Sequence, residues 1–187
     1  MKRRVLWIAA AAAASVALLS LLVVMALRTP ARKAAETPTM TPVVPTPAPE
    51  QRVILLFAGV DDLLHPELRS VPYPAEVGER ARIVVSELAA GPRGGLHPVF
   101  PYSVQVRGVF VDGRGQAFVD LDPPSEPLTG SSTELLMTYA VVNSILLNCP
   151  ELDTVQLLFG GREVKTLAGH LDLSRPLSLN KGFIATS

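Results

Sequence analysis

Three histidines are the first candidates for chemistry, because histidine can act as a general base or as a metal ligand near neutral pH. His65 and His97 each precede a proline, and His170 lies in the sequence AGHLDLSRP. None is followed three or four residues later by another His, Cys or carboxylate, which is the spacing of a helical ligand pair. His170 and Asp172 would share one side of an extended segment. A backbone-bonded loop histidine is nevertheless the simpler interpretation, and no metal ligand is predicted.

Hydrolysis is a second chemistry that the residue types allow. Ser131, His170 and Asp120 could be assembled into a Ser-His-Asp triad, but the chain has no GxSxG sequence to present the serine on a sharp turn. Asp120 and Asp122 lie two residues apart at a strand end, so their carboxylates could point together and form a weak cation site. A solvated strand end explains the same pair.

Two further motifs have structural explanations. The sequence GPRGG at residues 91–95 resembles a phosphate loop, but it follows a helix and lacks the closing Lys-Ser/Thr, so we expect a turn. Cys149 is the only cysteine, which excludes an intramolecular disulfide, a Cys-rich zinc site and a CxxC redox motif. We expect it to be a buried, inert thiol. The sequence therefore predicts no catalytic, cofactor-binding or metal-ligating residue.

The elements that would position these residues follow from periodicity. Apolar residues recur every three or four positions in two segments, which predicts helices over about 75–90 and from Ser131 to Asn148. Ser131 to Glu134 have capping-box spacing at the start of the second helix. The sequence DGRG at 112–115 predicts a hairpin turn, and Gly160-Gly161 predicts another. The expected strands are residues 52–58, 104–111, 116–121, 154–159 and 163–167.

This order, β-α-β-β-α-β-β, predicts an α+β two-layer sandwich. Two helices would pack on one face of a mixed or mostly antiparallel sheet. Such a sheet leaves a face or an edge available to a partner.

The N-terminal quarter of the chain differs in composition from this domain. Val5 to Leu27 form a run of 23 residues interrupted only by Ser15 and Ser20, long enough to cross a bilayer as a helix. It exceeds a usual signal-peptide core, which favours an uncleaved signal anchor, with a cleaved signal peptide as the alternative. Six prolines between Thr29 and Glu50 predict an extended stalk. We therefore expect an anchor at 1–28, a stalk at 29–50 and an extracytoplasmic domain at 51–187.

The net charge of zero conceals an asymmetry between these parts. Residues 1–50 hold six basic and two acidic residues, whereas residues 51–187 hold eleven basic and fifteen acidic ones. The acidic balance of the larger part argues against nucleic acid as a partner.

Several motifs, in order, resemble one known family. They are VILLFAG at the domain start, SELAAGP at a helix end, the strand FVDL, the strand TVQLLFGG and the close AGHLDLSRPL. Together they resemble the GerMN domain of the sporulation and spore germination protein GerM, over nearly all of residues 52–179. The resemblance implies a non-catalytic extracytoplasmic module that contacts other envelope proteins. Two departures from GerM are the single domain copy and the absence of a lipid-acceptor cysteine after the apolar run.

The sequence thus leads to the hypothesis of a single-pass protein of the bacterial cytoplasmic membrane, N-terminus inside, held by residues 5–27. Its domain would bind envelope or sporulation-complex proteins without a cofactor, and could oligomerise. The sheet edge and the loops Pro92 to Pro101 and Pro123 to Gly130 are the expected contact surfaces. The alternative is an envelope hydrolase or a small-ligand or cell-wall binder that uses His170 with Asp120 or Asp172.

Overall fold

The structure is a computed structural model that describes residues 50–128 and 130–186 of the 187-residue chain. The predicted membrane helix at 5–27 and all of the predicted stalk except Glu50 lie outside the described residues. Within the two described ranges, no helix combines the length and the hydropathy needed to cross a membrane.

Five strands, two α-helices and a short 3₁₀ helix make up the described part. In chain order they are β1 (Glu50–Ala58), β2 (Leu64–Pro72), α2 (Val77–Ala89), β3 (Val106–Val111), β4 (Gln116–Leu121), α3 (Ser131–Asn148), β5 (Thr154–Phe159) and η1 (Lys181–Phe183). The α+β class and both predicted helices are confirmed, and so are the hairpin of β3 with β4 and the strand β5.

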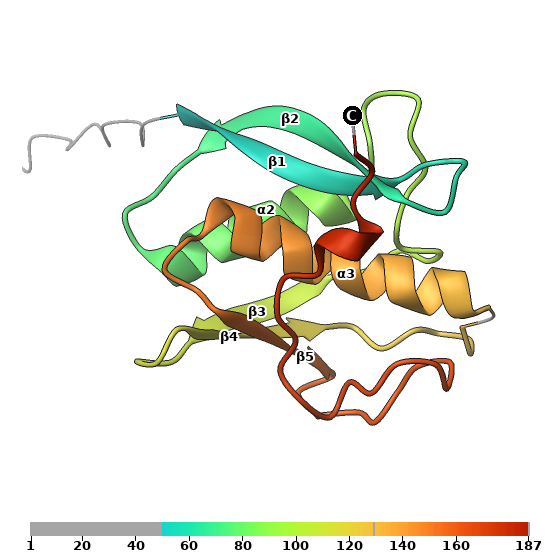
Figure 1. Cartoon of the computed structure of the whole chain (residues 1–187). Coiled ribbons are helices and arrows are strands. Elements are labelled where there is room, and N and C mark those ends of the chain that lie inside the picture. The colour runs from blue at the N-terminus through green and yellow to red at the C-terminus, as the bar shows by residue number, and fades with distance from the viewer. Residues whose placement is uncertain (1–49, 129, 187) are drawn as a thin grey trace, which may run out of the picture. The chain divides into compact units, whose positions relative to one another are not determined.

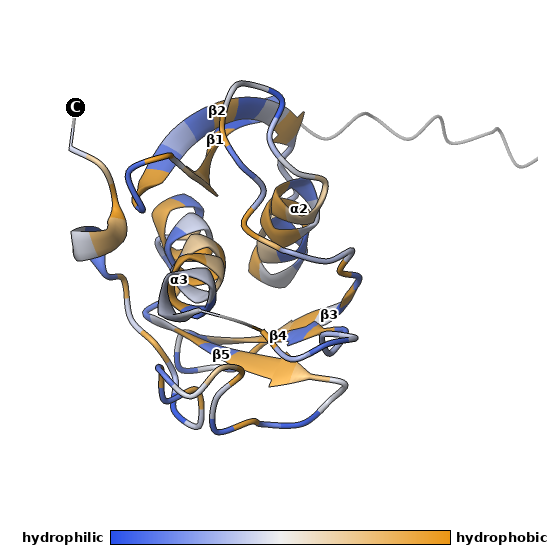
Figure 2. Cartoon of the chain, turned by 90° about the vertical axis from the view of Figure 1, so that its right-hand side faces the viewer, coloured by the Kyte–Doolittle hydropathy of each residue, from blue (hydrophilic) through white to orange (hydrophobic). Residues whose placement is uncertain are grey.

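The strands form two sheets, and the helices lie between them (Figure 1). Strands β1 and β2 pair antiparallel in one sheet. In the other, β3 pairs antiparallel with β4, which pairs parallel with β5. Both helices pack on the same face of the three-stranded sheet, as expected, but the two-stranded sheet covers their other side (Figure 2). The predicted single sheet is therefore wrong, because β1 pairs with a strand that the sequence reasoning assigned to a loop.

That strand, β2, has the sequence LHPELRSVP, and its prolines favoured a loop. Proline is tolerated where its missing N–H would face away from the neighbouring strand. The carbonyl of Leu64 accepts a hydrogen bond from the tail residue Ala185, so even-numbered residues of β2 direct their backbone groups away from β1. Pro66 and Pro72 both occupy such positions.

The predicted second hairpin, 154–159 with 163–167, is also wrong. After β5 the chain reverses through Gly160 and Gly161, whose φ angles of 60° and 76° suit glycine. Only a single bridge, Phe159 with Arg162, follows the turn. The chain then forms a loop across the end of α3, and Leu177 pairs with Val155 on the edge of β5.

Helix α3 is buried on nearly all sides because it lies between the two sheets. Its buried residues run without a break from Leu136 to Ile145. It also closes the edge of β1: the Ser144 hydroxyl accepts the Leu56 N–H at 3.1 Å, and Asn148 bonds both backbone groups of Ile54 at 2.9 and 2.7 Å. Side chains of a helix thus take the place of a third strand.

Candidate interaction surface

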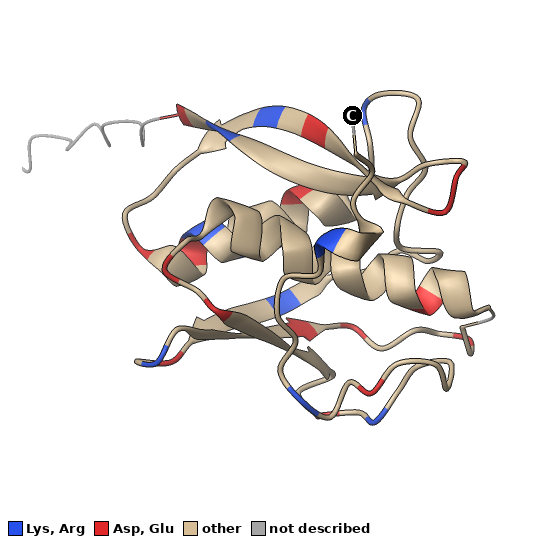
Figure 3. Ribbon diagram, in the orientation of Figure 1, with Lys and Arg blue, Asp and Glu red and all other residues tan. Residues whose placement is uncertain are grey.

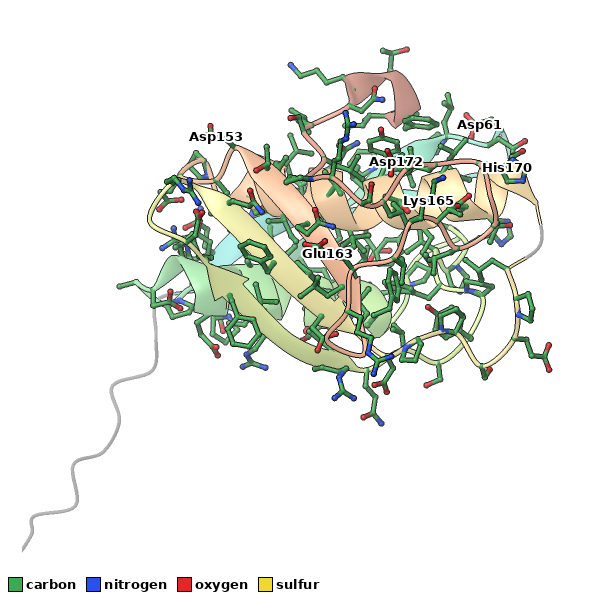
Figure 4. The ribbon with its side chains drawn as sticks, turned by 90° about the horizontal axis from the view of Figure 1, so that it is seen from below. Asp61, Asp153, Glu163, Lys165, His170 and Asp172 are labelled. Carbon is green, nitrogen blue, oxygen red and sulfur yellow. The ribbon has the colours of Figure 1, made fainter. Side chains whose placement is uncertain are left out.

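The outer face of the three-stranded sheet, turned away from the helices, carries aromatic side chains (Figure 4). In β4, Ala117, Val119 and Leu121 are buried toward the helices. Phe118 alternates with them and so lies on the outer face, where it is half-buried opposite Phe110 of β3. Phe110 is 64% exposed, and among the described residues it is the one aromatic side chain of the three large apolar side chains that are exposed, the others being Val60 and Leu68.

The Phe110 ring lies over Gly108 of its own strand. A Cβ atom placed on Gly108 would lie only 3.0 Å from the Phe110 ring. Any larger residue at position 108 would therefore displace the ring. We call Gly108, Phe110 and Phe118 the aromatic face.

Arg107 lies at one end of this face and binds both Asp120 and Asp122, the two carboxylates considered as a weak cation site. Its Nε donates to Asp120 Oδ2 and its Nη1 to Asp122 Oδ1, each at 3.2 Å. The N–H of Gly161 donates to the other oxygen of Asp120 at 2.7 Å. The two carboxylates therefore do point together, as the spacing predicted. Arg107, whose pKa is raised first by Asp122 and then by Asp120, balances one of their two negative charges.

The two loops predicted as contact surfaces meet at the N-terminal end of α3. They line a hollow of about 410 Å³ whose walls include Pro101 and Tyr102 from the first loop region and Ser125 to Leu128 from the second. Burial, and then the charge of Asp122, raise the pKa of Tyr102 to about 12. Thr129, within the second loop, lies outside the described residues. The structure thus brings the two loops together at one end of the domain.

The GPRGG turn binds a carboxylate of the protein itself. The backbone N–H groups of Arg93 and Gly94 donate to Glu67 at 3.0 and 3.1 Å. Glu67 also accepts Arg69 Nη2 at 2.6 Å. The N–H groups of this loop therefore bind a carboxylate of β2 in place of a phosphate, and this contact holds the loop against β2.

The three histidines lie in separate parts of the domain. His65 bonds Asp61, four residues before it, through Nε2 at 2.9 Å. The backbone of His97 pairs with that of Ala58. His170 lies in the loop beside α3 (Figure 4), and its backbone N–H donates to Glu134 at 2.8 Å. No cluster of three potential metal ligands occurs among residues 50–128 and 130–186.

The triad assembled from the sequence is not joined in the structure. Asp120 is held by Arg107 and Gly161, and the hydroxyl of Ser174 donates to Asp172 at 2.5 Å. Within the described part of the chain, no hydrogen bond connects Ser131, His170 and Asp120. Cys149 is fully buried, as predicted.

The sequence reasoning missed the role of Glu134, the only charged residue of α3 (Figure 3). The expected capping box does not form, since Gly130 occupies the N-cap without a side-chain bond. Glu134 is fully buried and instead accepts the N–H groups of Leu167, Ala168 and His170 at 2.7, 3.1 and 2.8 Å. Its capping-box spacing concealed this role, and no local signal in the sequence reveals it.

This arrangement defines a small α+β module in which two helices separate two sheets, and in which Glu67 and Glu134 hold loops to the framework. The family model Germane, described as sporulation and spore germination, matches residues 54–165, and the chain belongs to this family. The resemblance to GerMN domains inferred from the motifs is confirmed.

Solved structures show the same fold. A putative lipoprotein from Clostridium perfringens matches with a TM-score of 0.51 and 18% identity, over 69% of this chain and 87% of that one. The tandem GerMN domains of the sporulation protein GerM from Bacillus subtilis match with a TM-score of 0.53 and 18% identity. That match covers 70% of this chain and 46% of the tandem chain. A search of curated proteins gave no match.

Proposed function

We propose that this protein is a membrane-anchored component of the bacterial envelope whose GerMN-like domain acts without catalysis, as an assembly module in sporulation or germination. The family description supports the process. The apolar run at 5–27 supports the anchor, and the Clostridium perfringens relative is described as a putative lipoprotein, which fits an envelope location.

The observation that carries the proposal is the aromatic face. The Phe110 side chain is 64% exposed, and exposure of an apolar side chain to water is unfavourable. Burying it against a partner would contribute roughly 1.5–3 kcal/mol to binding. The acidic residues nearest to it, Asp120 and Asp122, are held by Arg107 and do not form an open reaction site. A surface of this kind is suited to binding another protein.

The proposed topology places the N-terminus in the cytoplasm and residues 51–187 outside. The proline-rich segment at 29–50 would hold the domain away from the bilayer, because polyproline II advances about 3.1 Å per residue. Protease added to spheroplasts should digest residues 51–187 only if they face outward. Protection of the domain in intact spheroplasts, with digestion after lysis, would contradict this topology.

Affinity capture from cross-linked envelopes tests the assembly role. The full chain should recover a reproducible set of envelope proteins, and Phe110→Ala should lose it. Leu68→Ala is the matched control, because Leu68 is 59% exposed on the other sheet. Capture that is the same for Phe110→Ala as for the unmodified chain would separate the function from the aromatic face.

The non-catalytic role has its own test in His170. We expect His170→Ala to leave the sporulation or germination phenotype unchanged, because the His170 contact with Glu134 uses only its backbone N–H. A loss of phenotype in a stably folded His170→Ala protein would favour the hydrolase or ligand-binding alternative.

A further inference from the structure

Strand β3 is an edge strand of the domain whose outer side is unpaired along its length. On the three-stranded sheet, the opposite edge strand β5 pairs with the tail through Leu177. On the other sheet, side chains of α3 bond β1, and Ala185 bonds Leu64 of β2. Among residues 50–128 and 130–186, no segment pairs with the outer side of β3.

The backbone groups on this outer side belong to Val109 and Val111. The N–H of Asp112 donates to the carbonyl of Gln116 at 2.9 Å, so Asp112 faces β4. Backbone direction alternates along a strand, which places the groups of Phe110 toward β4 and those of Val109 and Val111 toward the open edge. Unpaired groups of this kind can template the addition of another strand.

Space for another strand exists beside β3. An open groove of about 340 Å³ runs between the C-terminal end of α2 and the start of β3. Its helical wall consists of small residues, Ser86, Ala89 and Ala90, and its other wall is Val104 to Val106. Small side chains on the helix leave the edge accessible.

We propose that β3 pairs antiparallel with β3 of a second copy of this chain, in a register centred on Val109, and so joins two sheets into one of six strands. This inference deepens the proposed assembly function by naming the partner. If the domain bound only proteins other than itself, this inference would fail and the proposed assembly function would stand.

Two features of the β3 sequence are compatible with a second copy of β3 as its partner in this register. Gly108 of each copy lies opposite Phe110 of the other. Each ring covers Gly108 of its own strand in the single chain, and in the pair it would move across to the glycine of the second copy. The charges at the two ends of β3 are paired within each copy, Arg107 with Asp120 and Asp122, and Asp112 with Arg114. The register sets Arg107 opposite Val111 of the second copy, so no like charges face each other across the pair.

Dipolar electron paramagnetic resonance on the full chain in lipid vesicles tests this register. A nitroxide is attached at Gly113→Cys in the β3–β4 turn, where a new Cβ meets no atom within 4 Å. Position 113 of one copy lies eight residues along the strand from position 113 of the other, at about 3.4 Å per residue, which predicts a distance near 27 Å. The buried Cys149 should remain unlabelled.

Val109→Pro is the decisive variant. Proline removes an N–H that faces the open edge, so the β3–β4 ladder keeps its hydrogen bonds while the intermolecular pairing is blocked. We expect the 27 Å distance to disappear. Phe110→Ala provides a second variant that leaves the core intact, and two lost ring contacts should lower the association constant about fivefold. Leu68→Ala, the matched control, should keep the distance.

The outcomes separate cleanly. A 27 Å distance that Val109→Pro abolishes, or that Phe110→Ala weakens if the proline variant misfolds, supports pairing through β3. The absence of a defined distance in the labelled Gly113→Cys chain overturns it, as does a distance that survives when Val109→Pro is added to that chain and the protein is folded. If self-pairing is absent while envelope capture succeeds, this inference fails and the proposed function stands.

Discussion

The carboxylate of Glu134 accepts a 2.6 Å hydrogen bond from the hydroxyl of Thr166, 32 residues further along the chain. The same oxygen accepts the N–H groups of Leu167 and Ala168, and the second oxygen accepts that of His170. A charge on the central helix therefore holds the loop between β5 and the tail. Because the loop carries no strand of its own, this carboxylate replaces a sheet ladder as its support.

Replacing Glu134 by Gln should destabilise the domain by roughly 2–4 kcal/mol, since an amide NH₂ would face backbone donors and the charge-assisted bonds would be lost. Urea unfolding of the full chain, followed by circular dichroism, measures the change. Glu163→Gln, on an exposed residue of the same loop, is the matched control and should change stability by less than about 0.5 kcal/mol. Equal effects of the two substitutions would contradict the role assigned to Glu134.

The same carboxylate predicts a pH dependence. Burial raises the pKa of Glu134, but hydrogen bonds from Thr166 and from three backbone N–H groups outweigh it and hold the pKa below the usual value of 4.5. A depressed folded-state pKa contributes stability that is present above pH 4.5 and is lost as the pH falls through the folded value. The unfolding free energy of the unmodified chain should therefore fall more steeply in acid than that of Glu134→Gln. Parallel curves below pH 4.5 would count against this account.

Local patterns predicted the helices and the β3–β4 hairpin, because periodicity and turn residues determine such elements over a few positions. The partner of β1 could not be predicted in this way. Pro66 and Pro72 argue against a strand unless the direction of each backbone group is known, and that direction depends on the pairing itself. Burial on nearly all sides of α3 likewise depends on the second sheet, which the missed strand completes.

The candidate surface was only partly visible in the sequence. The sequence led to the expectation of a free sheet edge, without naming the strand, and of two exposed loops, which the structure brings together at one end of the domain. The sequence alone did not indicate that Phe110 is exposed. A phenylalanine in the strand VRGVFV is expected to be buried unless it is known which face of the sheet the helices cover. Glu134 was assigned to a cap for a similar reason: its four donors come from residues more than 30 positions away.

Arg69 should be sensitive to a change that keeps its charge. Its side chain is nearly fully buried, with Nε and Nη2 bonding Glu67 at 2.8 and 2.6 Å and Nη1 bonding the Glu87 carbonyl at 2.9 Å. Lysine cannot reproduce this planar set of donors, so Arg69→Lys should cost roughly 2–4 kcal/mol in urea unfolding. The exposed pair of Arg82 with Glu79 provides the control, and Arg82→Lys should cost less than about 0.5 kcal/mol. A small effect at Arg69 would show that the fork geometry is dispensable.

Ser144→Ala should weaken the edge of β1 because it leaves the buried Leu56 N–H without an acceptor. The expected cost is about 1–3 kcal/mol. Amide hydrogen exchange gives a local readout, and the Leu56 amide should exchange faster relative to the rest of β1. Ser132→Ala, in the exposed first turn of the same helix, should leave that rate unchanged. Unchanged protection of Leu56 in Ser144→Ala would mean that another acceptor replaces the hydroxyl.

Cys149 should resist alkylation until the domain unfolds. Burial raises the pKa of its thiol from 9.0 to about 11, which lowers the thiolate fraction at pH 8 by about 100-fold before access is considered. Iodoacetamide should therefore label the native chain slowly and the urea-unfolded chain quickly. Gly113→Cys, placed in the exposed β3–β4 turn, supplies an accessible thiol in the same molecule for comparison. Comparable native labelling at both positions would contradict the burial of Cys149.

The C-terminal tail should depend on Asn143, whose side chain bonds both backbone groups of Asn180 at 2.8 and 2.9 Å. Nearby, the rings of Phe183 and Tyr139 stack with centroids 4.5 Å apart. Asn143→Ala removes both bonds and should cost about 2–3 kcal/mol. Faster exchange of the Ala185 amide, which bonds Leu64, should accompany this loss. Asn180→Ala is the matched control: it keeps both backbone bonds and loses only a cap on Gly182, so about 0.5–1 kcal/mol is expected. If Asn180→Ala released Ala185 as fully as Asn143→Ala does, the cap and not the paired bonds would hold the tail across the two sheets.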